Sequence, residues 1–147
     1  MRVSIGNDHR GYELKNSIVN ILTNLGLTVY DKGCQNCSSV DYPDIASAVA
    51  RSIPQESDVG ILICGSGVGM SIAANKVKGI RAALVRDAEG AALCRQHNAA
   101  NVLCLASTTP QDKLEEIVKS FLYSNCPSLD RHADRVKKIT LIEEDVL

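Results

Sequence analysis

The sequence has few aromatic residues and almost no net charge. Phe, Trp and Tyr make up 3% of the 147 residues, with no Trp, and the formal net charge at pH 7 is -1. Proteins that bind nucleic acid neutralise phosphates with basic surfaces, and those that bind single strands stack bases on aromatic rings. We therefore expect no nucleic acid among the partners of this protein.

Long apolar runs are missing as well. No segment approaches the roughly 20 apolar residues that span a bilayer, and Met1–Gly6 lead into a strand-like pattern without a signal-peptide core. We expect a cytoplasmic protein that does not enter the membrane. With 45% hydrophobic and 22% charged residues, the chain can fill one core, which predicts a single domain over residues 1–147.

The six cysteines do not have the spacing of a disulfide or zinc framework. Most lie inside or beside apolar segments, which is typical of buried, reduced thiols. Cys34 and Cys37 have the spacing of a metal or redox pair, but no second Cys/His pair follows at a finger-like distance and no helix pattern begins there. The pattern favours reduced thiols and leaves any role of this pair open.

Strand-like and helix-like segments alternate along the whole chain. The strand-like segments are short apolar runs at residues 3–6, 27–30, 59–64, 82–85 and 102–105. Apolar residues recur at helical spacing between them and after the last one. Because neighbouring parallel strands need crossover connections, this order predicts an α/β fold: a Rossmann-like three-layer sandwich with a five-stranded parallel sheet flanked by helices.

Ligands in such folds bind beyond the carboxyl ends of the strands. The segment Cys64–Gly69 follows the third predicted strand, and its three alternating glycines leave backbone N–H groups free to face an anion. A nucleotide site is less favoured, because the segment lacks the full dinucleotide fingerprint and the Gly-Lys-Ser/Thr ending of a phosphate loop. A tight turn without a ligand is the structural alternative.

Two side chains of this segment can move protons. Cys64 lies beside a predicted helix N-terminus, where the helix dipole and free N–H groups favour a thiolate that can act as a base. Ser66 adds a hydroxyl that can pass a proton between two adjacent oxygens. Taken alone, Cys64 would be an ordinary buried cysteine, which is how we interpret Cys94 and Cys104.

Two of the three histidines, His9 and His97, are predicted at the same edge of the sheet. Asp8 precedes His9 and Asn98 follows His97, so a carboxylate and an amide accompany the imidazoles. A metal site built from Asp8, His9, His97 and Cys64 is disfavoured, because these residues are far apart in sequence and offer no local ligand pair.

Arg131 and Arg135 are one helical turn apart in the last predicted helix and so share one face. Two guanidinium groups in this arrangement suit a phosphate dianion. A solvated helix end with no ligand is the alternative.

These residues belong to motifs that span nearly the whole chain: Gly6–Gly11, Asp41–Pro43, Cys64–Gly69, Ala73–Lys76, Ile80–Ala82, Arg95–Asn98 and Arg131–His132. Together, in their order and spacing, they resemble the type B ribose-5-phosphate isomerases, whose wider family includes allose- and galactose-phosphate isomerases. The resemblance implies a Rossmann-like sandwich without metal or cofactor. It also implies dimers, or dimers of dimers, with active sites at the subunit interface.

The resemblance also implies roles for individual residues. Cys64 matches the base that moves a proton between C2 and C1, His97 helped by Asp8 matches the group that opens the sugar ring, and Ser66 matches the proton shuttle. Substrate contacts are expected at Asp8, His9, Tyr42, Gly65, Ser66, Gly67, Val68, Gly69, Asn98, Arg131 and Arg135. Of these, the loop and Asn98 would hold the enediolate oxygens, and His9 and the two arginines would hold the phosphate.

One position decides which branch of that family the sequence matches, and another departs from the family's pattern. Relatives that use a glutamate base carry it at the position of Met70, so this sequence matches the cysteine type. Many relatives carry an arginine where this chain has Thr108, a difference that bears on affinity or substrate choice.

The expected activity is the interconversion of ribose 5-phosphate and ribulose 5-phosphate through an enediolate, a step of the pentose phosphate pathway. An isomerase of allose or galactose 6-phosphate is the alternative, which the length of the pocket would decide. A non-catalytic sugar-phosphate or nucleotide-binding module is less favoured, because binding alone needs no base, shuttle and ring-opening acid.

Overall fold

The computed structural model describes residues 1–36 and 38–147, so Cys37 of the predicted pair lies outside the described residues. One parallel sheet forms the centre of the molecule, with the strand order β2-β1-β3-β5-β4. Its strands are β1 (Arg2–Asn7), β2 (Thr28–Asp31), β3 (Val59–Cys64), β4 (Ala82–Leu84) and β5 (Val102–Ala106). The five predicted strands are confirmed, with shifts of one residue at several ends.

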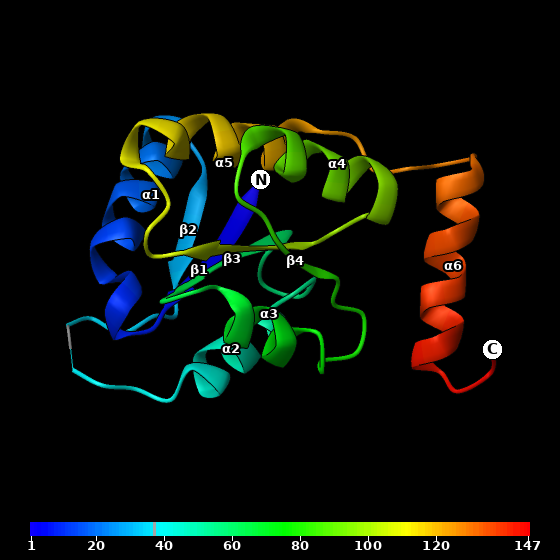
Figure 1. Ribbon diagram of the computed structural model, residues 1–147, viewed down its shortest axis with the longest axis horizontal. Helices are drawn as coiled ribbons and strands as arrows, with labels where there is room; N and C mark the ends of the chain where they lie inside the picture. The colour runs from blue at the N-terminus through cyan, green and yellow to red at the C-terminus, as the bar shows by residue number, and fades with distance from the viewer. Residues whose placement is uncertain (37) are drawn as a thin grey trace.

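Helices cover both faces of this sheet, which confirms the predicted three-layer sandwich (Figure 1). The helices are α1 (Tyr12–Asn24), α2 (Tyr42–Arg51), α3 (Val68–Ala74), α4 (Ala88–Asn98), α5 (Leu114–Tyr123) and α6 (Arg131–Glu143), with single 3-10 turns η1 (His9–Gly11) and η2 (Gln111–Lys113). Figure 1 shows α1, α4 and α5 on one face and α2 and α3 on the other. No helix in the described part of the chain is long and apolar enough to cross a membrane.

The layers follow from the alternation of side chains along the buried strands. In β3, Ile61 and Ile63 join the core beneath α1, α4 and α5, whereas Leu62 and Cys64 join the core beneath α2 and α3. Side chains of a strand point alternately to its two faces, so a strand that is apolar throughout must be covered on both. Each fully buried aliphatic side chain of this kind stabilises the fold by about 1.5–3 kcal/mol.

Helix α6 differs from the other helices, because it lies at one end of the molecule beyond the end of α4 and covers neither face of the sheet (Figure 1). Its N-terminus is well defined: the carboxylate of Asp130 accepts hydrogen bonds from the N–H groups of His132 and Ala133, at 2.9 and 3.0 Å. Ala133 is its one buried residue among those described, and apolar Ile139 and Ile142 are exposed. The fold of one chain therefore leaves most of α6 without a packing partner.

Candidate active site

A hollow of about 660 Å³ lies at the carboxyl ends of β1 and β3, where the fold class predicts a ligand site. Its lining consists of Asp8, His9, Arg10, Tyr42, Cys64, Gly65, Ser66, Val68, Gly69 and Ile72. Most of the predicted site residues are among them, so the structure brings together segments that are far apart in sequence. The local geometry of these residues determines which of them can contact a ligand or transfer a proton.

Cys64 ends β3 with its thiol held by the glycine-rich turn. The side chain is 5% exposed, and the backbone N–H of Gly67 donates a hydrogen bond to its Sγ at 3.1 Å. Gly67 has a φ of +77°, and a Cβ there would lie 2.5 Å from Cδ1 of Leu84, so only glycine fits this turn. The N–H of Gly67 thus fixes the position of the Cys64 sulfur at the hollow, where a thiol could act as a base on a bound ligand.

The other cysteines of the core differ from Cys64, because they lie away from the hollow. Burial raises the pKa of the Cys94 thiol to about 11, and it also raises the pKa of Cys104. Both are the ordinary buried thiols that the sequence predicts, since a raised pKa keeps them neutral near pH 7.

Asp8 joins the first and third strands at the hollow. Its N–H donates to the carbonyl of Ile63 at 3.1 Å, and its carboxylate accepts from the N–H groups of Arg10 and Gly11 at 2.9 and 3.1 Å. A Cβ on Gly11 would lie 2.8 Å from the carbonyl oxygen of Ile63, so the 3-10 turn packs tightly on the end of β3. This places a carboxylate, 7% exposed, in the same hollow as the thiol of Cys64.

Ser66 and Tyr42 complete the wall on the side of α3. The N–H of Val68 donates to Oγ of Ser66 at 3.2 Å, which orients the hydroxyl. The ring of Tyr42 packs against Gly69, where a Cβ would lie 2.8 Å from two ring carbons. The absence of a side chain at Gly69 therefore allows an aromatic wall at this point.

His97 lies elsewhere. Because α4 carries the chain back from the end of β4 to the start of β5, its last turn lies at the amino ends of the strands. The prediction that His9 and His97 share one edge is thus wrong within a single chain. The ring of His97 instead stacks on that of His132 in α6, with centroids 4.1 Å apart and planes 3° apart.

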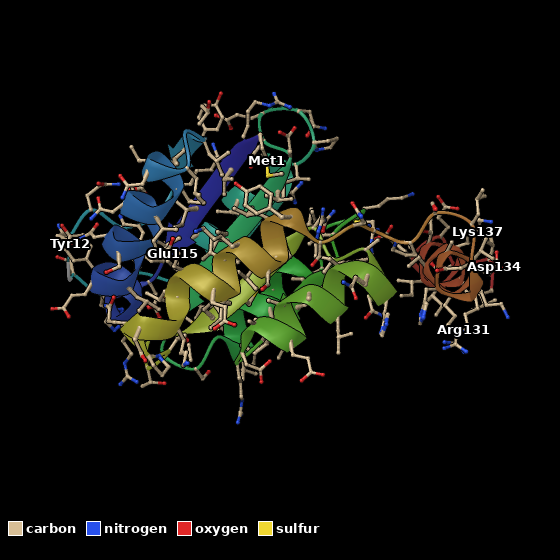
Figure 2. All side chains as sticks on the ribbon, turned by 90° about the horizontal axis from the view of Figure 1, so that it is seen from above. Met1, Tyr12, Glu115, Arg131, Asp134 and Lys137 are labelled. Carbon is tan, nitrogen blue, oxygen red and sulfur yellow. The ribbon has the colours of Figure 1, made fainter. Side chains whose placement is uncertain are left out.

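Asn98, Arg131 and Arg135 also lie outside the hollow. Asn98 lines a separate cavity of about 480 Å³ together with Ile139 and Ile142 of α6. Arg131 and Arg135 share the exposed surface of α6, and Figure 2 shows Arg131 at the opposite end of the molecule from Tyr12, which directly follows η1. One chain therefore divides the predicted site into two parts.

We call these parts the Cys64 group and the His97 group. The Cys64 group contains Asp8, His9, Tyr42, Cys64 and the loop Gly65–Gly69; the His97 group contains His97, Asn98, Arg131 and Arg135. Within each group the residues come from adjacent elements. The Cys64 group lies at the carboxyl ends of the strands, whereas His97 and Asn98 lie at the amino ends. No group of three His, Cys, Asp or Glu side chains in residues 1–36 and 38–147 is arranged to hold a metal ion.

Sequence reasoning missed Arg10 and Ile72, which both line the hollow. Arg10 lies inside the motif Gly6–Gly11, but nothing in the local pattern separates it from any other exposed arginine. Ile72 is an exposed apolar residue of α3. Only the packing of η1 and α3 around the loop reveals that these side chains face the same space.

The sequence profile described as Ribose/Galactose Isomerase matches residues 3–139. The chain belongs to the ribose/galactose isomerase family. A family member from Escherichia coli (strain K12), ribose-5-phosphate isomerase B, is 42% identical over 144 residues that cover 97% of each chain. The resemblance drawn from the motifs is therefore confirmed.

Solved structures of this family agree with the fold. Ribose-5-phosphate isomerase B from Clostridium thermocellum is 44% identical, with a TM-score of 0.95 over the whole of both chains. The Mycoplasma genitalium enzyme, solved with bound ribulose 5-phosphate, is 42% identical with a TM-score of 0.92 over 98% of this chain and 97% of its own. Both similarities extend over the sheet and the surrounding helices.

Proposed function

We propose that this protein interconverts ribose 5-phosphate and ribulose 5-phosphate. The observation that carries the proposal is the hydrogen bond from Gly67 N–H to Cys64 Sγ, which holds a thiol able to act as a base in the hollow at the carboxyl ends of the strands, where this fold binds ligands. Family relatives that carry the name ribose-5-phosphate isomerase B, at 42–44% identity, support the same substrate. The reaction needs no cofactor, and its expected setting is the pentose phosphate pathway of the cytoplasm.

The proton transfers follow from the chemistry of the Cys64 group. The Cys64 thiolate takes the proton from C2 of the open-chain aldose, and the electron pair of that C–H bond forms the C1–C2 double bond of an enediolate. Ser66 passes a proton from O2 to O1, and the Cys64 thiol returns its proton to C1, which leaves a carbonyl at C2. Backbone N–H groups of the loop Gly65–Gly69 stabilise the negative oxygen between these steps.

The cyclic sugar must open before this step, since its carbonyl is masked. Opening requires a proton at the ring oxygen and removal of one from the anomeric hydroxyl, which a histidine performs near neutral pH. We assign this role to His97, helped by Asp8. In this proposal Asn98 contacts the enediolate, while His9, Arg131 and Arg135 hold the phosphate.

Such a division of labour requires two chains, because His97 and Arg131 are remote from Cys64 in one chain. A homodimer in which the His97 group of one chain meets the Cys64 group of the other would complete the site. The exposed apolar residues Ile139, Leu141 and Ile142 on α6 support this arrangement, since a helix with an unpartnered apolar surface gains stability from burying it. Dimers could pair further into tetramers.

A six-carbon sugar phosphate is the second candidate substrate. A further hollow of about 350 Å³ is lined by Ser66, Thr108 and Thr109, and thus meets the first one at Ser66. Thr108 is shorter than the arginine of many relatives, so additional room at this side favours a longer sugar such as allose or galactose 6-phosphate.

A coupled assay of ketose formation tests the function directly. The purified protein is given ribose 5-phosphate, allose 6-phosphate and galactose 6-phosphate, each with and without a chelator. We expect the highest kcat/KM with ribose 5-phosphate and no change when metal is removed. Faster turnover of a six-carbon substrate would favour the second candidate, and no ketose from any of the three would refute both.

A further inference from the structure

Arg10 occupies a place in the hollow that the family comparison does not assign. It lies in η1, and its side chain extends over Gly65 at the start of the glycine-rich loop. A Cβ on Gly65 would lie 2.9 Å from Cδ of Arg10 and 3.2 Å from its Nη1. The missing side chain at Gly65 therefore makes the room in which this guanidinium rests against the loop.

The guanidinium of Arg10 has no partner within residues 1–36 and 38–147. By contrast, Arg2 pairs with Asp58, while Arg81 and Arg95 donate to backbone carbonyls of Ala99 and Ala100. Asp8, the one carboxylate in the lining of the hollow, accepts backbone N–H groups of η1 and makes no ion pair with Arg10. The hollow thus contains a cation whose hydrogen-bond donors are unused among the described residues.

Three other arginines also lack a partner in the described part of the chain: Arg86, Arg131 and Arg135. None of them lines the hollow of Cys64, and Arg10 is the one Lys or Arg in its lining. It also directly follows His9, so two basic side chains of one short turn border the same space. A charged group at this position selects for an anion in the substrate.

We propose that Arg10 binds the phosphate group of the substrate, from the same chain that supplies Cys64. The planar guanidinium offers several N–H donors in a fixed geometry, which matches the oxygens of a phosphate dianion. The enediolate, by contrast, has the N–H groups of the loop. This inference rests on the proposed function and adds to it, since the phosphate would then be held by both chains of a dimer.

The test compares Arg10→Ala and Arg10→Lys with Arg51→Ala as a matched control. Arg51 is also an exposed arginine, but it ends α2 near the amino ends of the strands, away from the hollow, and its Nε donates a hydrogen bond to Oγ of Ser47. For Arg10→Ala we expect KM for ribose 5-phosphate to rise about tenfold with kcat within about twofold, because a charge-assisted hydrogen bond is worth about this factor or more. The inhibition constant of inorganic phosphate should rise by a similar factor.

Arg10→Lys should recover part of the affinity, since a point charge remains but the paired donors are lost. Arg51→Ala should change neither constant. An unchanged KM and phosphate inhibition constant in Arg10→Ala would overturn the proposal, as would a fall in kcat alone, which would place Arg10 on the enediolate.

Direct binding separates this inference from the proposed function. Titration calorimetry of inorganic phosphate into the wild-type protein and the Arg10→Ala variant requires no turnover. Weaker phosphate binding in the variant would support the role of Arg10 even if the wild-type protein isomerised none of the sugars tested. Equal binding by both proteins would contradict it, whatever the activity.

Discussion

The Cys64 group and the His97 group differ in how their residues are held. Cys64 and Asp8 are nearly buried, and each is fixed by backbone N–H groups of a tight turn. His97 is half-buried, Asn98 is exposed, and the arginines lie on a helix with one buried residue among those described. A single chain thus preorganises the residues that we propose transfer protons, and it leaves at its surface those that we propose open the ring and hold the phosphate.

This difference shows which side chains the fold of one chain positions accurately. Proton transfer at carbon requires the base within a fraction of an ångström of its proper place, which buried turns between strands and helices provide. A phosphate can be held by long side chains from a surface helix, since guanidinium groups reach and adapt.

The largest effect is expected for Cys64→Ala, which removes the proposed carbon base. We expect kcat to fall about 100-fold or more with KM little changed, because loss of a general base affects the transition state rather than binding. Steady-state kinetics with ribose 5-phosphate measure this. Near-native kcat in the variant would exclude Cys64 as the base.

The next effect is the recovery of activity in mixed dimers. A Cys64→Ala chain and an Arg131→Ala/Arg135→Ala chain, each nearly inactive, are co-expressed with different tags and the mixed dimer is isolated. If the two groups meet across chains, one site receives both lesions and the other is wholly native, so about half of the wild-type activity per dimer should return.

The same mixture separates the two arrangements clearly. If both groups of a site came from one chain, each site would carry one lesion and no activity would return. Verified mixed dimers that stay inactive would therefore rule out the two-chain site, while the homodimers of each variant provide the background rate.

A smaller and more selective effect is expected for His97→Asn. The variant should lose more activity on the cyclic sugar than on an acyclic analogue that cannot close, because only the cyclic form needs ring opening. A pre-steady-state assay on both substrates measures the two rates. Equal losses would remove His97 from the ring-opening step.

The smallest effect concerns pH and the stack of His97 on His132. Partial burial lowers the pKa of His132 below its ordinary value of 6.5, and the nearby His97 lowers it further. The folded protein then binds fewer protons than the unfolded chain below pH 6.5, so the stability contributed by the stack is present above this pH and is lost as the pH falls through the lowered pKa.

NMR titration of the imidazoles checks this prediction. His132 should titrate below 6.5 in the wild-type protein and closer to 6.5 in His97→Asn. Titration of His132 at its ordinary pKa in both proteins would show that the stack does not affect protonation.

Much of the fold and of the Cys64 group was predictable because its signals are local. The apolar run Val59–Cys64 identifies a strand covered on both faces, and the glycines at 65, 67 and 69 identify the turn that follows. The match of Asp8 and His9 to the end of the first strand comes from the same reasoning. Only the exact strand ends, such as Asp31 rather than Tyr30, differed.

The placement of His97 and Arg10 shows where that reasoning stops. His97 was expected beside His9. The crossover helix α4, however, returns the chain to the amino ends of the strands, so its last residues lie away from the carboxyl end of β1. Arg10 could not be identified from the sequence, because its place in the hollow depends on its contact with Gly65, which follows a different strand.

The sequence by itself thus determined the alternation of strands and helices, the parallel sheet and the thiol at the end of β3, because side-chain period and turn chemistry act between near neighbours in the chain. Tertiary structure decided which side chains share a hollow. It separated His97 and Arg131 from Cys64 and brought Arg10 to Gly65, since contacts of this kind depend on the direction of each crossover and on how elements far apart in sequence pack.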